Sequence, residues 1–252
     1  MSRYFLELAY KGTDYSGFQV QNNAPTIQSE VERAFSILER QSVILTGSSR
    51  TDAGVHARQN YFHFDFEDEL NHQFIYKMNA ILPPSIVLKQ VLLVKPDAHS
   101  RFNAISRQYD YYIYQFKNPF LSDVSYYYPY KLSIDLLNDA SNILKEYTDY
   151  TSFSKRNTQV KSFLCQIERS GWIIQDEQLV FSITANRFLR GMVRALTATM
   201  LQVGRRNISV DEFRSIIEVK DNTRASFAVP PHGLFLSSVN FPENYFEGVK
   251  KI

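Results

Sequence analysis

The chain has 252 residues, with 28 Lys and Arg against 26 Asp and Glu, giving a formal net charge of +2. Hydrophobic residues make up 44% and charged residues 21%, which excludes a disordered chain. The single cysteine, Cys165, excludes a disulfide framework and a cysteine zinc site. No apolar run is long enough to cross a membrane and no signal peptide is visible, so we expect a cytoplasmic protein that does not bind membranes.

The first half of the chain predicts interspersed strands and helices. Alternation of apolar side chains at period two predicts strands, and recurrence at i, i+4, i+8 predicts helices. The expected strands are 3–10, 42–47, 59–67 and 86–94, and the expected helices are 27–40, capped by Thr26, and 70–81.

The second half continues in the same style. The expected strands are 109–116, 162–174, 178–185 and 234–239, and the expected helices are 134–147, 187–203 and 210–219. Strands that alternate this strongly favour an α+β fold with a mostly antiparallel sheet over a doubly wound parallel one. We divide the chain into an N-terminal half, 1–103, and a C-terminal half, 104–252.

The first candidate for chemistry is GSSRTDAGVHA at 47–57, which follows a short strand. A polar turn between two strands is the simple interpretation. Arg50 and Asp52, however, stand two residues apart in a tightly turned segment, so the backbone can direct both into one cleft. No Gly-Lys-Ser or Gly-Lys-Thr follows, which excludes a phosphate-binding P-loop.

The second candidate is RFLRGMVRALTATMLQVGRR at 187–206, which has five arginines and no acid. The predicted helix places Arg187, Arg190 and Arg194 on one face. A solvated basic face is one interpretation. Because Arg194 is flanked by apolar residues, burial with a carboxylate partner is the other, and Asp52 is a candidate for that partner.

The third candidate is AHSRFNAISRQYDYYIY at 98–114. Arginines mixed with tyrosines suit nucleic acid, because guanidinium groups bind phosphates and rings stack on bases. For most of these tyrosines, however, sheet packing is the favoured interpretation. The histidines His56, His63, His72, His99 and His232 show no metal-ligand spacing, so no metal is predicted.

These segments resemble a known family. GSSRTDAGVHA is similar to the signature loop of the tRNA pseudouridine synthase A (TruA) family. Further similar segments follow in the family order over nearly the whole chain: YKGTDYSGFQVQ, TIQSEVERAF, SRFNAISRQYDYYIY, RFLRGMVRALTATMLQVG and PPHGLFLSSVNFP. Two residues depart from the family pattern, because Ser48-Ser49 replace a Gly/Ala pair and Phe18 stands where tryptophan is usual.

The resemblance implies the pseudouridine synthase fold, in which two ferredoxin-like halves form a bent sheet, flanked by helices, around a central cleft. It implies an isomerase that converts uridine to pseudouridine at positions 38–40 of the tRNA anticodon stem-loop. Such an enzyme uses no cofactor and no metal, and the bacterial members are homodimers.

The resemblance also assigns roles. Asp52 matches the catalytic aspartate, Tyr109 the tyrosine that packs on the target uracil, and Arg194 the basic partner of the aspartate. Arg50 matches the arginine that holds the target base out of the stack, and Leu234 an apolar position of the uracil pocket. The residue types predict phosphate contacts from Arg58, Arg101, Arg107, Lys155, Arg187, Arg190, Arg205 and Arg206.

Two other functions remain to be weighed. A non-catalytic RNA-binding protein of the same fold needs no Asp52, so an intact loop counts against it. A glycoside hydrolase usually needs a second carboxylate near the nucleophile, and the 47–57 loop offers none.

Overall fold

The structure is a computed structural model that describes residues 1–155 and 160–252. These form two compact units: Met1–Ile105 with Leu236–Ile252, and Ser106–Phe235. The sequence-based division lies between residues 103 and 104, and the segment from Leu236 onward belongs with the first unit. Strand β9 (Leu234–Asn240) therefore has residues in both units.

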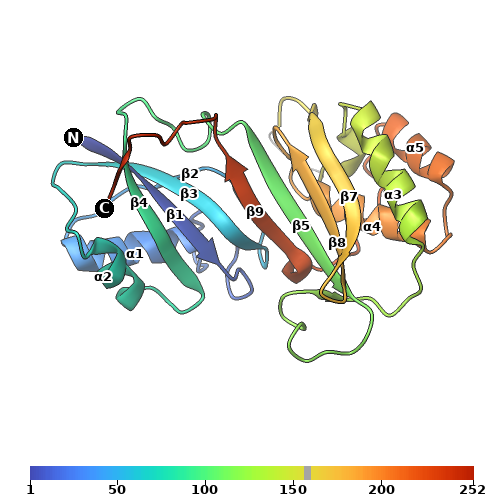
Figure 1. Ribbon diagram of the computed structural model, residues 1–252, viewed down its shortest axis with the longest axis horizontal. Coiled ribbons are helices and arrows are strands. Elements are labelled where there is room, and N and C mark those ends of the chain that lie inside the picture. The colour runs from blue at the N-terminus through green and yellow to red at the C-terminus, as the bar shows by residue number, and fades with distance from the viewer. Residues whose placement is uncertain (156–159) are drawn as a thin grey trace. The chain divides into compact units, whose positions relative to one another are not determined.

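The first unit is a mostly antiparallel sheet with the strand order β10-β4-β1-β3-β9, and β2 also pairs with β3 (Figure 1). Its elements are β1 (Ser2–Tyr10), α1 (Ile27–Glu39), β2 (Thr46–Gly47), β3 (His56–Phe66), α2 (Phe74–Ile81), β4 (Ile86–Val94), the Leu236–Asn240 part of β9, and β10 (Lys250–Lys251).

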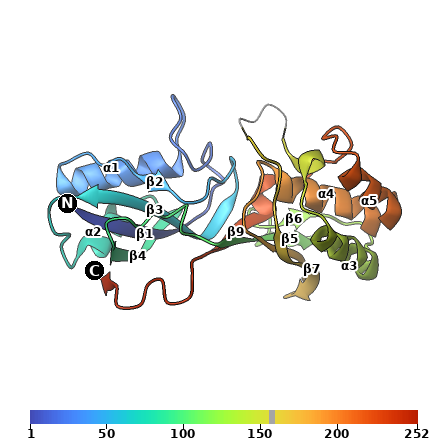
Figure 2. The same cartoon turned by 90° about the horizontal axis from the view of Figure 1, so that it is seen from above.

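Helix α1 covers one face of this sheet (Figure 2). Its Phe35 packs edge-on against Phe64 and Phe66 of β3 and against Phe74 of α2. Because side chains alternate along a strand, the even-numbered residues of β3 face the helices and the odd-numbered ones face away.

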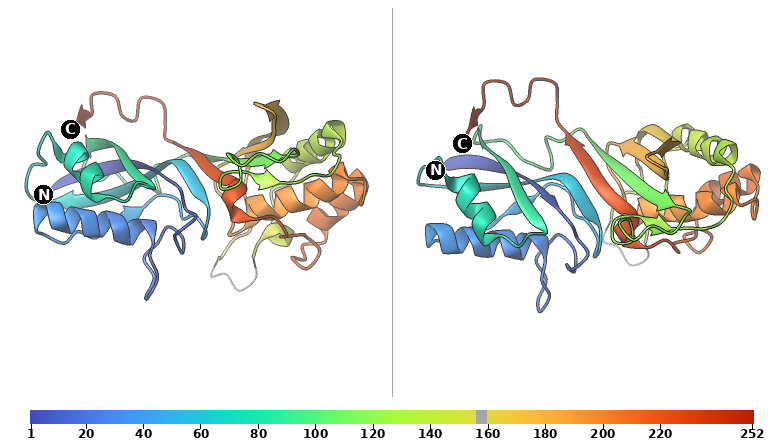
Figure 3. Two further views of the ribbon diagram at one scale, coloured as in Figure 1. Left: turned by 90° about the horizontal axis from the view of Figure 1, so that it is seen from below. Right: turned by 60° about the horizontal axis from the view of Figure 1, so that its bottom comes forward.

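The opposite face is covered by the C-terminal segment 241–249, which lies on the other side of the sheet from α1 (Figure 3). Phe241 and Phe246 both contact Phe5 of β1 and Tyr61 of β3. This cover explains why Phe5 is fully buried although it faces away from α1.

The second unit has the antiparallel strand order β5-β8-β7, with β6 paired parallel to β5. Helices α3, α4 and α5 pack together beside this sheet (Figure 1). Its elements are β5 (Ser106–Tyr114), β6 (Tyr126–Tyr127), α3 (Ile134–Ile143), β7 (Ile167–Gln175), β8 (Gln178–Ala185), α4 (Met192–Gly204), α5 (Val210–Glu218), and short 3-10 turns at Leu144–Glu146, Thr151–Phe153 and Pro231–Gly233.

The predicted α+β class with a mostly antiparallel sheet is confirmed. The predicted cap of the first helix is also confirmed, because the Thr26 side chain accepts a hydrogen bond from the Ser29 amide. The strand predicted at 86–94 has those bounds as β4.

Several predicted bounds were wrong, each because of a specific hydrogen bond or strand pairing. The strand predicted at 42–47 is reduced to Thr46–Gly47, because within that segment only these two residues pair with β3. The helix predicted from residue 70 begins at Phe74, because Asn71 closes a turn by accepting hydrogen bonds from Gln73 and Phe74. The strand predicted from residue 162 begins at Ile167, because Cys165 pairs instead with the Thr148 carbonyl.

Candidate active site

The predicted catalytic residue Asp52 lies in a turn that leads into β3. The amide of Val55 donates to the Asp52 carbonyl over 3.1 Å, which closes the turn. Asp52 is partly buried, Arg50 is exposed, and Thr51 between them is buried. The turn therefore presents the two predicted side chains while the residue between them anchors the backbone.

A second segment, 10–18, supports this turn through backbone hydrogen bonds. Gly12 N donates to His56 Nδ1 (3.0 Å), Phe18 N to the Thr51 carbonyl (3.1 Å), and Gly54 N to the Tyr15 carbonyl (3.4 Å). We call residues 10–18 and 48–56 together the paired loops.

The contact between the paired loops requires glycine at residue 12. A Cβ atom built there would lie 2.0 Å from the carbonyl oxygen of Val55, far inside van der Waals contact. Because the obstacle is backbone, no side-chain movement relieves it, so Gly12 permits the close approach.

Beneath the turn, a buried polar network joins three side chains. Tyr10 Oη lies 2.8 Å from Thr51 Oγ1, and Asn60 Nδ2 donates to Tyr10 Oη over 3.1 Å and to the Ser49 carbonyl over 2.7 Å. Burial raises the pKa of Tyr10, so its hydroxyl stays protonated and can donate. The network fixes the backbone of residues 49–51, directly before Asp52.

The two departures from the family pattern lie against the same turn. Ser49 is buried, and its amide donates to Asn60 Oδ1 over 3.3 Å. The ring of Phe18 stacks on Phe62 with centroids 4.5 Å apart. Both residues thus belong to the support of the turn.

The predicted common helix face for Arg187, Arg190 and Arg194 is wrong. Helix α4 begins at Met192, and only Arg194 lies in it. Gly191, which precedes the helix, has φ +73° and lies within a turn closed by Met192 N and the Leu189 carbonyl, so residues 187–190 lie outside the helix. A positive φ favours glycine and stops the helical pattern from extending towards the N-terminus.

Arg194 is half-buried in the first turn of α4. Its Nε and Nη2 both donate to the Val229 carbonyl, over 3.0 and 2.6 Å. This fork fixes the guanidinium group against the Val229 carbonyl. A guanidinium group has five N–H donors, so this side chain can bind an anion as well.

Tyr109 and Arg107 lie on β5, opposite residues of β8. The Tyr109 ring is almost fully buried and meets Phe188 edge-on with centroids 5.0 Å apart. Arg107 Nη1 donates to the Asn186 carbonyl over 3.0 Å. Both side chains therefore contact the 186–188 segment, of which the sequence analysis had assigned 187 and 188 to a helix.

Leu234 is buried at the start of β9, just after the short turn Pro231–Gly233. The Tyr111 hydroxyl donates to the Pro230 carbonyl over 2.7 Å. Tyr111 is fully buried, so this tyrosine belongs to the sheet packing that the sequence analysis favoured.

The remaining predicted basic residues differ in their surroundings. Five of them are exposed, namely Arg58, Arg101, Lys155, Arg190 and Arg206, and Arg187 is partly buried. The Arg205 guanidinium lies 3.9 Å from the centroid of the Tyr130 ring, so this side chain packs on an aromatic surface. The predicted site residues are divided between the two units. The first unit contains Arg50, Asp52, Arg58 and Arg101, and the second unit contains the others.

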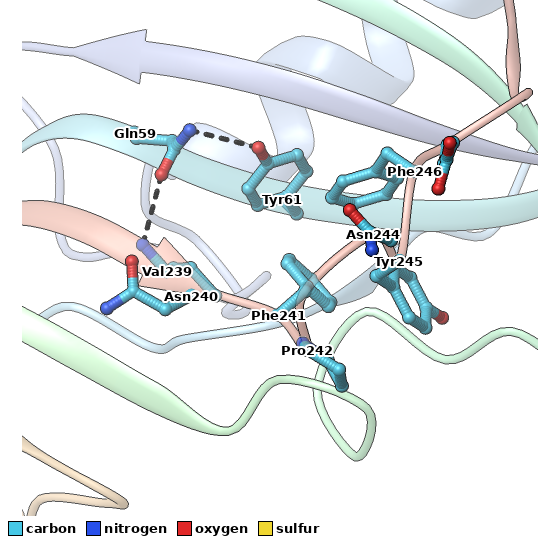
Figure 4. A pocket seen from close by; sticks show the side chains of 10 residues that line it. Gln59, Tyr61, Val239, Asn240, Phe241, Pro242, Asn244, Tyr245 and Phe246 are labelled. Carbon is cyan, nitrogen blue, oxygen red and sulfur yellow. Dashed lines mark hydrogen bonds between the residues drawn. The ribbon is translucent and has the colours of Figure 1, made fainter.

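A pocket of about 490 Å³ lies within the first unit (Figure 4). It is formed by the end of β9, the C-terminal segment and β3, where Gln59 donates to Tyr61 and accepts from Val239. None of the predicted site residues lines it.

Comparison with known proteins gives full-length matches. A tRNA pseudouridine synthase A of Parabacteroides distasonis is 43% identical over 98% of this chain and 98% of its own length. The protein of that name from Bacteroides thetaiotaomicron is 44% identical over 100% and 95%. The Staphylococcus aureus protein of that name is 33% identical over 96% and 92%.

This chain belongs to the tRNA pseudouridine synthase A family. A family model described as tRNA pseudouridine synthase also matches residues 147–242. The predicted family is thus confirmed over nearly the whole chain. The sequence analysis matched the segment YKGTDYSGF to the family but gave no role to Tyr10 or Gly12. It did not predict any role for Asn60.

Within residues 1–155 and 160–252, no group of three or more His, Cys, Asp and Glu side chains could hold a metal ion. No helix in this part of the chain is long and apolar enough to span a membrane.

Proposed function

We propose that this chain converts uridine to pseudouridine at positions 38–40 of the tRNA anticodon stem-loop, with Asp52 as the nucleophile. The observation that carries the proposal is the paired loops, which hold Asp52 through buried side-chain bonds and backbone contacts. A preorganised carboxylate is what a covalent mechanism needs, because misplacement of the attacking atom is costly.

The reaction is an isomerisation. The N1–C1′ bond of uridine breaks, the uracil turns, and a C5–C1′ bond forms, while C5 loses a hydrogen and N1 gains one. Because no atom is added and no electron is transferred overall, the residues proposed here need no cofactor or metal.

We assign Arg194 as the cation that keeps Asp52 ionised. A carboxylate that leaves water tends to take up a proton, and a nearby guanidinium favours the charged form. The fork of Arg194 on the Val229 carbonyl supports this assignment, because it orients the guanidinium group without neutralising it.

The target uridine must leave the helical stack, which costs a few kcal/mol. We assign Arg50 to the space that the base vacates, and Tyr109 to the face of the flipped uracil beside Leu234. Arg50 is exposed, as a group that enters RNA must be. Its substitution by alanine should lower turnover more than tRNA affinity.

The exposed arginines and Lys155 are proposed to bind tRNA phosphates. We also propose a homodimer in the cytoplasm, where its tRNA substrate lies, because a net charge of only +2 per chain leaves a weak field unless two chains combine their arginines. Sedimentation equilibrium tests the dimer, and a steep fall of affinity with salt tests the phosphate contacts.

Tritium release from a tRNA transcript labelled at uridine C5 tests the reaction. We expect release by the wild type and by Asp68→Ala, at an exposed aspartate of the same unit outside the paired loops, and none by Asp52→Ala. Release by Asp52→Ala would refute the nucleophile. No release from any of the three, with tRNA still bound, would favour an RNA-binding protein without catalysis.

A further inference from the structure

A column of rings runs from the core of the first unit to its surface. Phe5 lies 6.0 Å from His63, His63 lies 4.4 Å from His99, and His99 lies 4.1 Å from Phe102, measured between ring centroids. Phe5 and His63 are buried, whereas Phe102 is 75% exposed. A large apolar side chain is thus held at the surface by the rings beneath it.

The turn that carries Phe102 is fixed by hydrogen bonds. The amides of Arg101 and Phe102 both donate to Nδ1 of His99, over 3.1 and 3.3 Å. His99 N donates to Asn103 Oδ1 (2.6 Å), and the Tyr245 hydroxyl donates to the same oxygen (3.0 Å). The exposure of Phe102 therefore follows from an ordered backbone, and little entropy remains to be lost on binding.

A cation accompanies the exposed ring. The Arg101 guanidinium carbon lies 5.8 Å from the Phe102 centroid, and its side chain is exposed. Arg3 forms an ion pair with Asp65 over 2.7 Å. The Arg101 guanidinium places a positive charge beside the Phe102 ring. Asp97 and Lys95 stand exposed just before this turn and offset each other in charge.

We propose that His99, Arg101 and Phe102, the Phe102 platform, bind an unpaired base of tRNA, with Phe102 stacked on the base and Arg101 on an adjacent phosphate. The proposal rests on the proposed function, which makes tRNA the RNA concerned. An aromatic ring beside an arginine is the usual means of binding single-stranded RNA. The core of a protein–protein interface, by contrast, is depleted of charge.

Fluorescence tests the stacking directly. Phe102→Trp places an indole on the platform, and Trp172, the sole native tryptophan, is 3% exposed and contributes a constant background. We expect tRNA to quench the new emission along the same curve as binding measured by filter retention. Tyr76→Trp, at a 77% exposed residue of α2, is the matched control and should not be quenched.

Affinity gives the second measurement. We expect Phe102→Ala to weaken tRNA binding about tenfold, Phe102→Leu to weaken it nearly as much, and Phe102→Trp to preserve it. Tyr76→Ala should bind as the wild type does. Because Phe102 is exposed, these variants should keep the wild-type unfolding midpoint, which circular dichroism checks.

The outcomes separate this proposal from the proposed function. Unquenched Phe102→Trp emission with tRNA bound, or unchanged affinity of Phe102→Ala, overturns the platform even if the wild type releases tritium. Quenching and weakened binding support the platform even if the wild type releases none. A change in sedimentation on Phe102→Ala with unchanged tRNA affinity would assign the surface to a protein partner and overturn the proposal.

Discussion

The loop of Asp52 and the segment of Arg194 are held in place in different ways. The Asp52 turn depends on a distant part of the sequence, because segment 10–18 and Asn60 supply its hydrogen bonds. The turn before Arg194 is closed locally, by Met192 N and the Leu189 carbonyl, and by a glycine with positive φ. In the proposed mechanism, the first arrangement positions the reacting group, and the second, together with the bonds from Arg194 to the Val229 carbonyl, orients a charge.

This difference has a physical reason. A nucleophile must reach one atom at bonding distance, so small displacements are costly. A charge acts over a longer range and tolerates more movement. We therefore expect substitutions in the support of the Asp52 turn to lower activity through geometry, and substitutions at Arg194 to lower it through electrostatics.

The largest effect is expected from Arg194→Met. Loss of the cation should lower turnover about a hundred- to a thousandfold, comparable to the removal of one preorganised electrostatic contact at a reacting centre. Single-turnover tritium release measures it, and Arg224→Met, at an exposed arginine of the same unit, is the control. Wild-type turnover in Arg194→Met would refute the role in catalysis.

The next effect tests the paired loops. Gly12→Ala forces its Cβ against the Val55 carbonyl, so the loops must separate, at a cost of about 1–3 kcal/mol in the free energy of unfolding. Turnover should fall about a hundredfold, as expected for a nucleophile displaced by an ångström. Gly171→Ala has only Asn138 Oδ1 near its Cβ, at 3.8 Å, and should change neither quantity.

A pair of tyrosines sharpens the comparison further. Tyr10→Phe removes a hydroxyl bonded to two buried partners, whereas Tyr111→Phe removes one bonded only to the Pro230 carbonyl. We expect losses of about 1–3 and about 1 kcal/mol in the free energy of unfolding. Urea denaturation measures both. Equal losses would show that the second hydrogen bond of the Tyr10 hydroxyl adds no stability.

The smallest effect is a pH dependence in the first unit. Burial, with His99 and Arg3 nearby, lowers the pKa of His63 from 6.5 to about 4, while Asp65 opposes the shift. The unfolded chain therefore takes up this proton first, and stability should fall as the pH drops from 6.5 towards 4. His63→Asn should reduce that fall in urea denaturation. The same change in slope for His72→Asn, at an exposed histidine, would contradict the assignment to His63.

Much of the fold could be predicted because local patterns coincide with tertiary ones. Strand β4 and the Thr26 cap depend on residues a few positions apart, and they occur as predicted. The start of α4 could not be predicted, since arginines and apolar residues continue the helical period through 187–191. Gly191 interrupts it only through its backbone conformation.

The candidate site divides in the same manner. Asp52 and Arg50 could be proposed from the sequence because a distinctive motif surrounds them, and that motif also predicted the family, which is confirmed. The contributions of Tyr10 and Asn60 could not be predicted. Tyr10 lies 41 residues from its partner Thr51, and Asn60 lies 50 residues from its partner Tyr10. Nothing in the spacing of an isolated tyrosine and asparagine indicates that their side chains meet.

The sequence by itself determined the family, the α+β class and the residues of the signature loop, because these depend on local patterns and on residue identity. Only the tertiary structure decided what holds that loop and what the end of the chain covers. Segment 241–249 buries the sheet face opposite α1, and the turn at 99–103 exposes Phe102. The cover by segment 241–249 depends on contacts between residues far apart in the chain. The turn at 99–103 is closed by local hydrogen bonds, but the His63–His99 ring contact and the bond from Tyr245 to Asn103 join it to distant residues. Such distant contacts leave no periodic signal in the sequence.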